Sequence, residues 1–153
     1  MDVEVAALRG CAPLVGPAAR IVLVDDHPMI RAGLAAALDA EPDLQVCAEG
    51  PDGAAGAAVV LQQRPDIVLM DIEMPVMNGV DATRQILSDW PEARVVILTA
   101  FAEQRLVQSA MAAGAFGFIL KDADPQSVVC AVRRAMRGIL PVGEEMSHLP
   151  MRR

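Results

Sequence analysis

Two things are nearly missing from this sequence: aromatic side chains and apolar stretches long enough to cross a membrane. Aromatic residues make up only 3% of the 153 residues, while hydrophobic residues make up 54%. The core must therefore be built from alanine, valine, leucine, isoleucine and methionine, with methionines filling gaps in it. No apolar run approaches the ~20 residues that span a bilayer. The N-terminus carries Asp2 and Glu4 instead of the basic region of a secretory signal, so a soluble protein of the cytoplasm is predicted.

Cysteine is also scarce. Cys11, Cys47 and Cys130 are odd in number, far apart, and lack the paired CxxC spacing of a zinc site. This pattern argues against both a zinc site and a disulfide framework, and it suits a reducing cytoplasm. Cys47 and Cys130 fall on predicted apolar faces, so we expect them to be small core residues.

Positive charge is limited and almost all of it is arginine. The formal net charge is −7, which argues against a protein that binds nucleic acid over a broad face. The longest basic cluster, Arg133, Arg134 and Arg137, is interpreted as the solvent-facing side and last turn of a helix. Lys121 is the only lysine beside twelve arginines.

The length suits one domain, and from Arg20 onward strand and helix patterns alternate. Strands are expected at residues 20–25, 44–48, 66–70, 94–99 and 116–120, and helices at 28–40, 53–63, 80–89, 102–112 and 125–137. Three strands are continuously apolar, which indicates parallel strands covered on both faces. We therefore predict a doubly wound α/β domain over residues 20–138 with five parallel strands and five helices. Residues 1–19 are expected to be a loose extension, and residues 139–153 a tail or truncated linker.

Polar residues follow four of the expected strands. Asp25 and Asp26 follow the first, Asp71 the third, Thr99 the fourth and Lys121 the fifth. In doubly wound sheets, ligands bind at the carboxyl ends of the strands, so these side chains are predicted to share one site. Three carboxylates suit Mg²⁺ or Mn²⁺. A carboxylate such as Asp71 can attack phosphorus, while an ammonium and a hydroxyl contact the phosphoryl oxygens. Any one of these acids alone could instead be a helix cap.

The sequence resembles the receiver domains of two-component response regulators, specifically the NarL/FixJ-like group. The matching segments, in family order, are Val24-Asp25-Asp26-His27-Pro28, Met70-Asp71-Ile72-Glu73-Met74-Pro75 with Asn78-Gly79, Leu98-Thr99-Ala100, and the run from Gly114 to Lys121. The resemblance implies a flavodoxin-like sheet of order 2-1-3-4-5.

The resemblance also implies a role for each matching position. Asp71 would accept phosphate from a sensor histidine kinase. Asp26, Asp71 and the backbone carbonyl of Glu73 would hold Mg²⁺, with Asp25 acting through water. Thr99, Lys121 and the aromatic Phe118 would bind phosphate or switch conformation, and phosphorylation could drive homodimerisation. His27 is expected to be a loop residue of the subfamily.

Two other functions remain possible from the sequence. One is an Mg²⁺-dependent phosphatase or phosphotransferase with an aspartyl-phosphate intermediate, in which Glu73 would be the general acid and base. The other is a DNA-binding regulator, but the acidic charge and the lack of a helix-turn-helix argue against direct DNA contact by this chain. We therefore expect either a stand-alone receiver or a fragment of a transcription factor.

Overall fold

The computed structural model describes residues 11–99, 104–121 and 124–139. Five parallel strands form one sheet in the order β2-β1-β3-β4-β5. The strands are β1 (Ala19–Val24), β2 (Leu44–Gly50), β3 (Ile67–Asp71), β4 (Val95–Thr99) and β5 (Gly117–Leu120). The helices are α2 (Pro28–Asp39), α3 (Gly53–Gln63), α4 (Gly79–Asp89), α5 (Gln104–Ala112) and α6 (Pro125–Met136). The predicted fold class and strand order are confirmed, and element bounds differ from the prediction by only a few residues.

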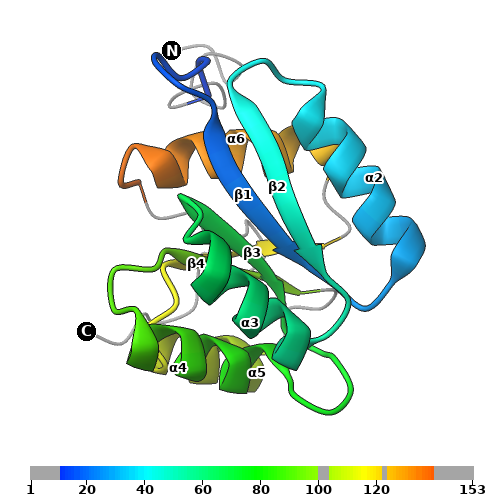
Figure 1. Ribbon diagram of the computed structural model, residues 1–153, viewed down its shortest axis with the longest axis vertical. Helices are drawn as coiled ribbons and strands as arrows, with labels where there is room; N and C mark the ends of the chain where they lie inside the picture. The colour runs from blue at the N-terminus through cyan, green and yellow to red at the C-terminus, as the bar shows by residue number, and fades with distance from the viewer. Residues whose placement is uncertain (1–10, 100–103, 122–123, 140–153) are drawn as a thin grey trace.

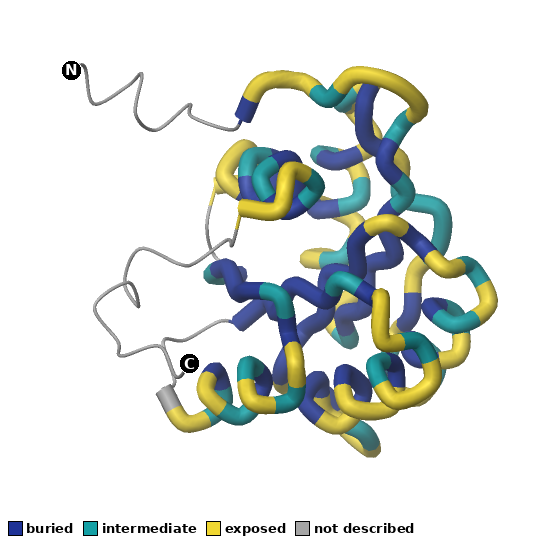
Figure 2. Tube along the Cα trace, turned by 90° about the vertical axis from the view of Figure 1, so that its left-hand side faces the viewer, coloured by how far each residue is buried: buried dark blue, intermediate teal, exposed yellow. Residues whose placement is uncertain are grey.

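The helices cover both faces of the sheet (Figure 1): α2 and α6 on one, α3, α4 and α5 on the other. Successive residues of a strand point to opposite faces, so each strand contributes to two cores. In β1, Val22 and Val24 pack toward α3, whereas Ile21 and Leu23 pack toward α2 and α6. Figure 2 shows the result as buried strands inside a shell of half-exposed helices. None of the helices within the described residues is long and apolar enough to cross a membrane.

Local sequence sets the start of several helices. Asn78 caps α4 by accepting a hydrogen bond from the Asp81 backbone amide, and Asp124 caps α6 through the Gln126 amide. Pro28 and Pro125 stand in the first turns of α2 and α6, where a missing N–H leaves no hydrogen bond unmade. These caps begin the helices directly after the loops that carry the predicted site residues.

Of the expected loose extension, residues 1–19, the structure describes 11–19: Ala19 begins β1, and residues 11–18 are held against the domain. Cys11 forms a disulfide with Cys130 of α6, and the Leu14 amide donates to Asp43 Oδ2 at 2.9 Å. The sequence-based prediction of no disulfide is therefore wrong, because the fold brings together two cysteines that are 119 residues apart. Cys47 is a half-buried free thiol beside the core, as expected.

Arg133 also differs from its prediction as a solvated residue. It is buried, and its guanidinium pairs with Asp43 through Nε and Nη2, at 2.9 and 2.8 Å. Its Nη1 donates to the backbone oxygen of Cys11 at 3.1 Å. The N-terminal segment thus covers a side of α6 that the hydrophobic pattern assigned to solvent.

Candidate functional site

The strand register brings the predicted residues to one edge of the sheet. Asp71 is the last residue of β3 and pairs with Leu98, directly before Thr99 at the end of β4. Thr99 in turn pairs with Leu120, and Lys121 follows. Asp25 follows β1, where its amide donates to the Gly50 oxygen at 3.1 Å. The carboxyl ends of four parallel strands therefore supply the site, as the sequence predicts.

Lys121 links two of these strand ends. Its Nζ lies 2.9 Å from Asp71 Oδ2 and 3.1 Å from Asp25 Oδ1. All three residues are buried, with at most 9% of any of them exposed. Pairing compensates the buried charges, since an isolated ion would be very unfavourable there.

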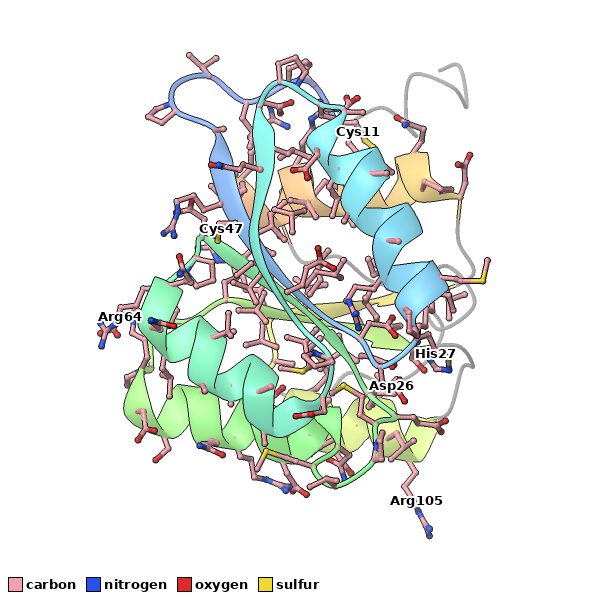
Figure 3. The ribbon with its side chains drawn as sticks, turned by 45° about the vertical axis from the view of Figure 1, so that its right-hand side comes forward. Cys11, Asp26, His27, Cys47, Arg64 and Arg105 are labelled. Carbon is pink, nitrogen blue, oxygen red and sulfur yellow. A yellow bond between two sulfur atoms is a disulfide. The ribbon has the colours of Figure 1, made fainter. Side chains whose placement is uncertain are left out.

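The loop after β1 brings two more side chains to the site. Figure 3 shows Asp26 and His27 side by side where α2 begins. His27 Nδ1 lies 3.1 Å from Asp26 Oδ1, 3.2 Å from Asp25 Oδ1 and 2.9 Å from Lys121 Nζ. His27 lies in the loop before α2, as expected, and the structure adds that its ring contacts the acids. Its extended backbone at the start of α2 turns the ring back over the acids, a geometry that periodicity does not reveal.

The donor atoms suit a divalent cation. One ligand atom from each of Asp25, Asp26, His27 and Asp71 can be chosen so that all lie within 4.8 Å of one another. Asp25 Oδ2 and Asp26 Oδ1 are buried and accept no hydrogen bond of good geometry, although Lys121 Nζ lies 3.0 Å from the first and His27 Nδ1 3.1 Å from the second. Several acceptors therefore face one another, and a hard cation would relieve this arrangement.

The titration of Asp71 reflects the same crowding. Burial is the largest cause and raises the pKa of Asp71 to about 6; Lys121 opposes the shift and the charge of Asp25 adds to it. Burial disfavours the ammonium form of Lys121, but hydrogen bonds to Asp71 and Asp25 outweigh burial and raise its pKa. Lys121 therefore stays charged, while Asp71 gains a proton readily in the metal-free protein.

Comparison with known families agrees with this geometry. Residues 21–133 match the family described as Response regulator receiver domain. The chain belongs to this family. The receiver is similar to curated regulators, including LiaR of Bacillus subtilis (strain 168), with 38% identity over 119 residues. The alignment covers 78% of this chain and 56% of LiaR. VraR of Staphylococcus aureus (strain NCTC 8325 / PS 47) is 39% identical, with 78% and 57% covered. The chain thus spans little more than half the length of these regulators.

Solved receivers have the same fold. The receiver domain of the putative response regulator NarL from Mycobacterium tuberculosis is 34% identical and superposes with a TM-score of 0.77, covering 80% of this chain and 99% of that one. A LuxR-family two-component regulator from Aurantimonas sp. SI85-9A1 is 33% identical with a TM-score of 0.81, covering 85% and 93%. LiaR is described as a transcriptional regulatory protein and VraR as a response regulator protein.

The remaining predicted residues of the receiver lie around Asp71. The Glu73 amide is 3.4 Å from Asp71 Oδ1, and the Glu73 side chain is exposed. Thr99 is 2% exposed, and its backbone oxygen accepts from the Lys121 amide at 2.6 Å. Phe118 is 1% exposed in the core beneath α4 and α5. The residues directly after Thr99, positions 100–103, lie outside the described residues.

Proposed function

We propose that this receiver accepts a phosphoryl group on Asp71 from a sensor histidine kinase in the cytoplasm, and that phosphorylation switches a protein-interaction surface. The observation that carries the proposal is the buried Asp71 carboxylate, held by Lys121 at 2.9 Å beside two further acids. A lysine at this place supplies a compact point charge for phosphoryl oxygens, whereas arginine would bring a wider planar group.

In the proposed reaction, a carboxylate oxygen of Asp71 attacks the phosphorus of a phosphohistidine. The phosphorus–nitrogen bond breaks, its electron pair stays on the imidazole, and an acyl phosphate remains on Asp71. Asp71 Oδ2 is held by Lys121, while Oδ1 accepts a long hydrogen bond, 3.4 Å, from the Glu73 amide. Oδ1 is thus the oxygen better placed to attack, and Lys121 is positioned to pair with the transferred group.

The proposal includes Mg²⁺, or Mn²⁺ in its place. Asp26, Asp71 and the Glu73 backbone carbonyl would hold it directly, and Asp25 would act through water. When bound, the cation offsets negative charge on the phosphoryl oxygens. The converging carboxylate oxygens, of which one on Asp25 and one on Asp26 are buried without a hydrogen bond of good geometry, support this part.

We assign the switch to Thr99 and Phe118. Both are buried, on neighbouring strands β4 and β5. A move of the Thr99 hydroxyl toward the phosphoryl group would open space for Phe118 to turn inward and would alter the surface of α5, β5 and α6. The size of this population shift is limited by how much better the phosphoryl group is bound in one state than in the other.

The output of the switch is proposed from the relatives. LiaR is described as a transcriptional regulatory protein, so transcription control through a partner or an effector domain is the proposed output. No direct nucleic-acid contact is proposed for residues of this chain. We also propose homodimerisation on activation: with beryllofluoride and Mg²⁺, size-exclusion chromatography should show earlier elution, and unchanged elution would contradict it.

Phosphorylation is tested by intact mass after incubation with Mg²⁺ and acetyl phosphate, or with a phosphorylated kinase. We expect one added phosphoryl group in the parent protein and in Asp81→Asn, an exposed control on α4, and none in Asp71→Asn. No label in the parent with saturating donor would reject the proposal. Rapid turnover of small phosphate esters would instead favour the aspartyl-phosphate phosphatase in which Glu73 is the general acid.

A further inference from the structure

The disulfide between Cys11 and Cys130 lies away from the phosphorylation site. Figure 3 shows Cys11 beside α6, near the opposite end of the sheet from Asp26 and His27. We propose that Cys11 and Cys130 form a reversible oxidation site, at which a low-molecular-weight disulfide oxidises both thiols and fastens residues 11–14 to α6. The site is independent of phosphoryl transfer to Asp71.

The N-terminal segment is held in place by more than the sulfur bridge. Arg133 donates to the Cys11 oxygen at 3.1 Å, and Arg137 donates to the oxygens of Ala12 and Pro13 at 2.5 and 3.2 Å. The Leu14 amide binds Asp43, which also accepts both bonds from Arg133. These contacts do not require oxidised sulfur, so they keep the two thiols together in the reduced chain.

Such preorganisation has a kinetic consequence. Holding two groups side by side raises the effective concentration of one at the other. The Cα atoms of Cys11 and Cys130 are 4.7 Å apart, within the range that a disulfide spans. Oxidation therefore needs little movement of the backbone, although the cysteines are 119 residues apart in the sequence.

Reversibility follows from the compartment. Disulfides inside a reducing cytoplasm are usually transient and redox-sensing, and this step of the argument rests on the proposed cytoplasmic signalling function. Cys130 is half-exposed on α6, whereas Cys11 is buried. A small reagent thus reaches Cys130 first. Cys47 lies apart from Cys11 on β2 (Figure 3) and is a separate thiol.

The exchange is balanced without a cofactor. The Cys130 thiolate attacks one sulfur of a low-molecular-weight disulfide, forms a mixed disulfide and expels one thiolate. The Cys11 thiolate then attacks the Cys130 sulfur and expels the second. Two protein thiols are oxidised, the reagent is reduced to two thiols, and the protons pass to the two departing thiolates. A dithiol reverses the sequence.

The Cys11–Cys130 disulfide attaches the N-terminal segment to α6, which is one of the elements assigned to the phosphorylation-dependent surface. Arg133 is only 7% exposed because Asp43 and the Cys11 segment surround it. Oxidation therefore attaches residues 11–14 covalently to this side of α6, and reduction leaves them held by non-covalent contacts, which include the hydrogen bonds above and the packing of Leu14 against the core. Amide exchange at residues 11–18 is expected to be slower in the oxidised protein.

The test treats the native protein with glutathione disulfide and then with dithiothreitol, and after each step counts free thiols by alkylation in denaturant and intact mass. We expect one alkylated cysteine, Cys47, in the oxidised protein and three in the reduced one, with a Cys11–Cys130 peptide on mapping. In Cys47→Ser the counts become none and two. Asp71→Asn should behave like the parent, so this test can fail or succeed separately from phosphorylation.

Three results of this thiol count would overturn the proposal: three reactive thiols despite excess glutathione disulfide, a bridge to Cys47, or a bridge that dithiothreitol cannot open in the native protein.

Reduction should also lower the melting temperature by roughly 5 to 15 °C. At limiting oxidant, Arg137→Ala should oxidise about threefold to tenfold more slowly. Arg105→Ala, an exposed control on α5, should match the parent; equal rates for both variants would refute the preorganised site.

Discussion

Lys121 Nζ lies 2.9 Å from Asp71 Oδ2, although the two residues are 50 positions apart in the sequence. The same ammonium contacts both carboxylate oxygens of Asp25, at 3.1 Å from Oδ1 and 3.0 Å from Oδ2. One buried cation thus joins the ends of β1, β3 and β5. The chain can hold two buried carboxylates at this edge because Lys121 compensates part of their charge.

Two substitutions of Lys121 distinguish the effect of its positive charge from the effect of its compact shape. In Lys121→Met, Asp25 and Asp71 lose their common partner, so we expect the free energy of unfolding at pH 8 to fall by about 3 kcal/mol. Labelling by acetyl phosphate should be reduced but detectable, because Asp71 remains. Lys121→Arg should be intermediate in both measurements, since it keeps the charge on a wider group. Urea unfolding and intact mass would check this, and a fully stable, fully labelled methionine variant would contradict it.

The raised pKa of Asp71 predicts a pH dependence of stability. Burial raises this pKa from 3.8 to about 6, so the folded protein holds the proton more tightly than the unfolded chain. The protonated Asp71 therefore contributes to the free energy of unfolding below about pH 4, and this contribution is lost as pH rises from about 4 through about 6. Asp71→Asn should be more stable than the parent by roughly 1 to 3 kcal/mol at pH 7 to 8 in chelator-treated buffer. The two proteins should converge below about pH 4, and a constant gap at every pH would argue against this cause.

The pair between Asp43 and Arg133 predicts the opposite dependence. The hydrogen bonds from Arg133 hold the pKa of Asp43 well below its usual range, so this carboxylate stabilises the fold above about pH 4 and the contribution is lost as pH falls below that value. Asp43→Asn should lower the free energy of unfolding at pH 7 by about 2 to 4 kcal/mol. The loss should shrink at lower pH.

An exposed ion pair provides the control for that variant. Arg84 and Asp81 pair at 3.1 Å on the surface of α4, where such contacts contribute little. Arg84→Gln should change stability by less than about 0.5 kcal/mol. Equal losses in Asp43→Asn and Arg84→Gln, measured by denaturant unfolding, would show that burial of the Arg133 pair is unimportant.

Two glycines make a matched pair of substitutions. A Cβ on Gly79 would lie 2.2 Å from the backbone oxygen of Asp71 and 2.8 Å from Ile72 Cα, whereas a Cβ on Gly33 meets nothing within 4 Å. Gly79→Ala should therefore displace the end of β3, lower stability by roughly 1 to 3 kcal/mol and weaken phosphoryl labelling. Gly33→Ala, inside α2, should raise stability by about 0.5 to 1 kcal/mol with labelling unchanged. Parent-like stability and labelling in Gly79→Ala would contradict the close approach.

The fold and the strand-end residues could be predicted because the information is local. Continuous apolar runs such as residues 67–70 indicate parallel strands covered on both faces, and Pro28 and Asp124 mark helix starts. Once the strands are parallel, Asp25, Asp71, Thr99 and Lys121 must share one edge. The roles predicted for Asp71, Glu73, Thr99 and Phe118 in phosphorylation stay predictions.

The sequence by itself determined the alternation of strands and helices, the two-faced core and the edge at which the acids and Lys121 meet. Only the tertiary structure decided that Cys11 reaches Cys130, that Arg133 is buried against Asp43, and that His27 turns over the acids. The spacing of apolar residues along the sequence indicates which face of a helix or strand is buried. It carries no record of which distant polar or sulfur atom will lie opposite, because that pairing depends on how the elements pack.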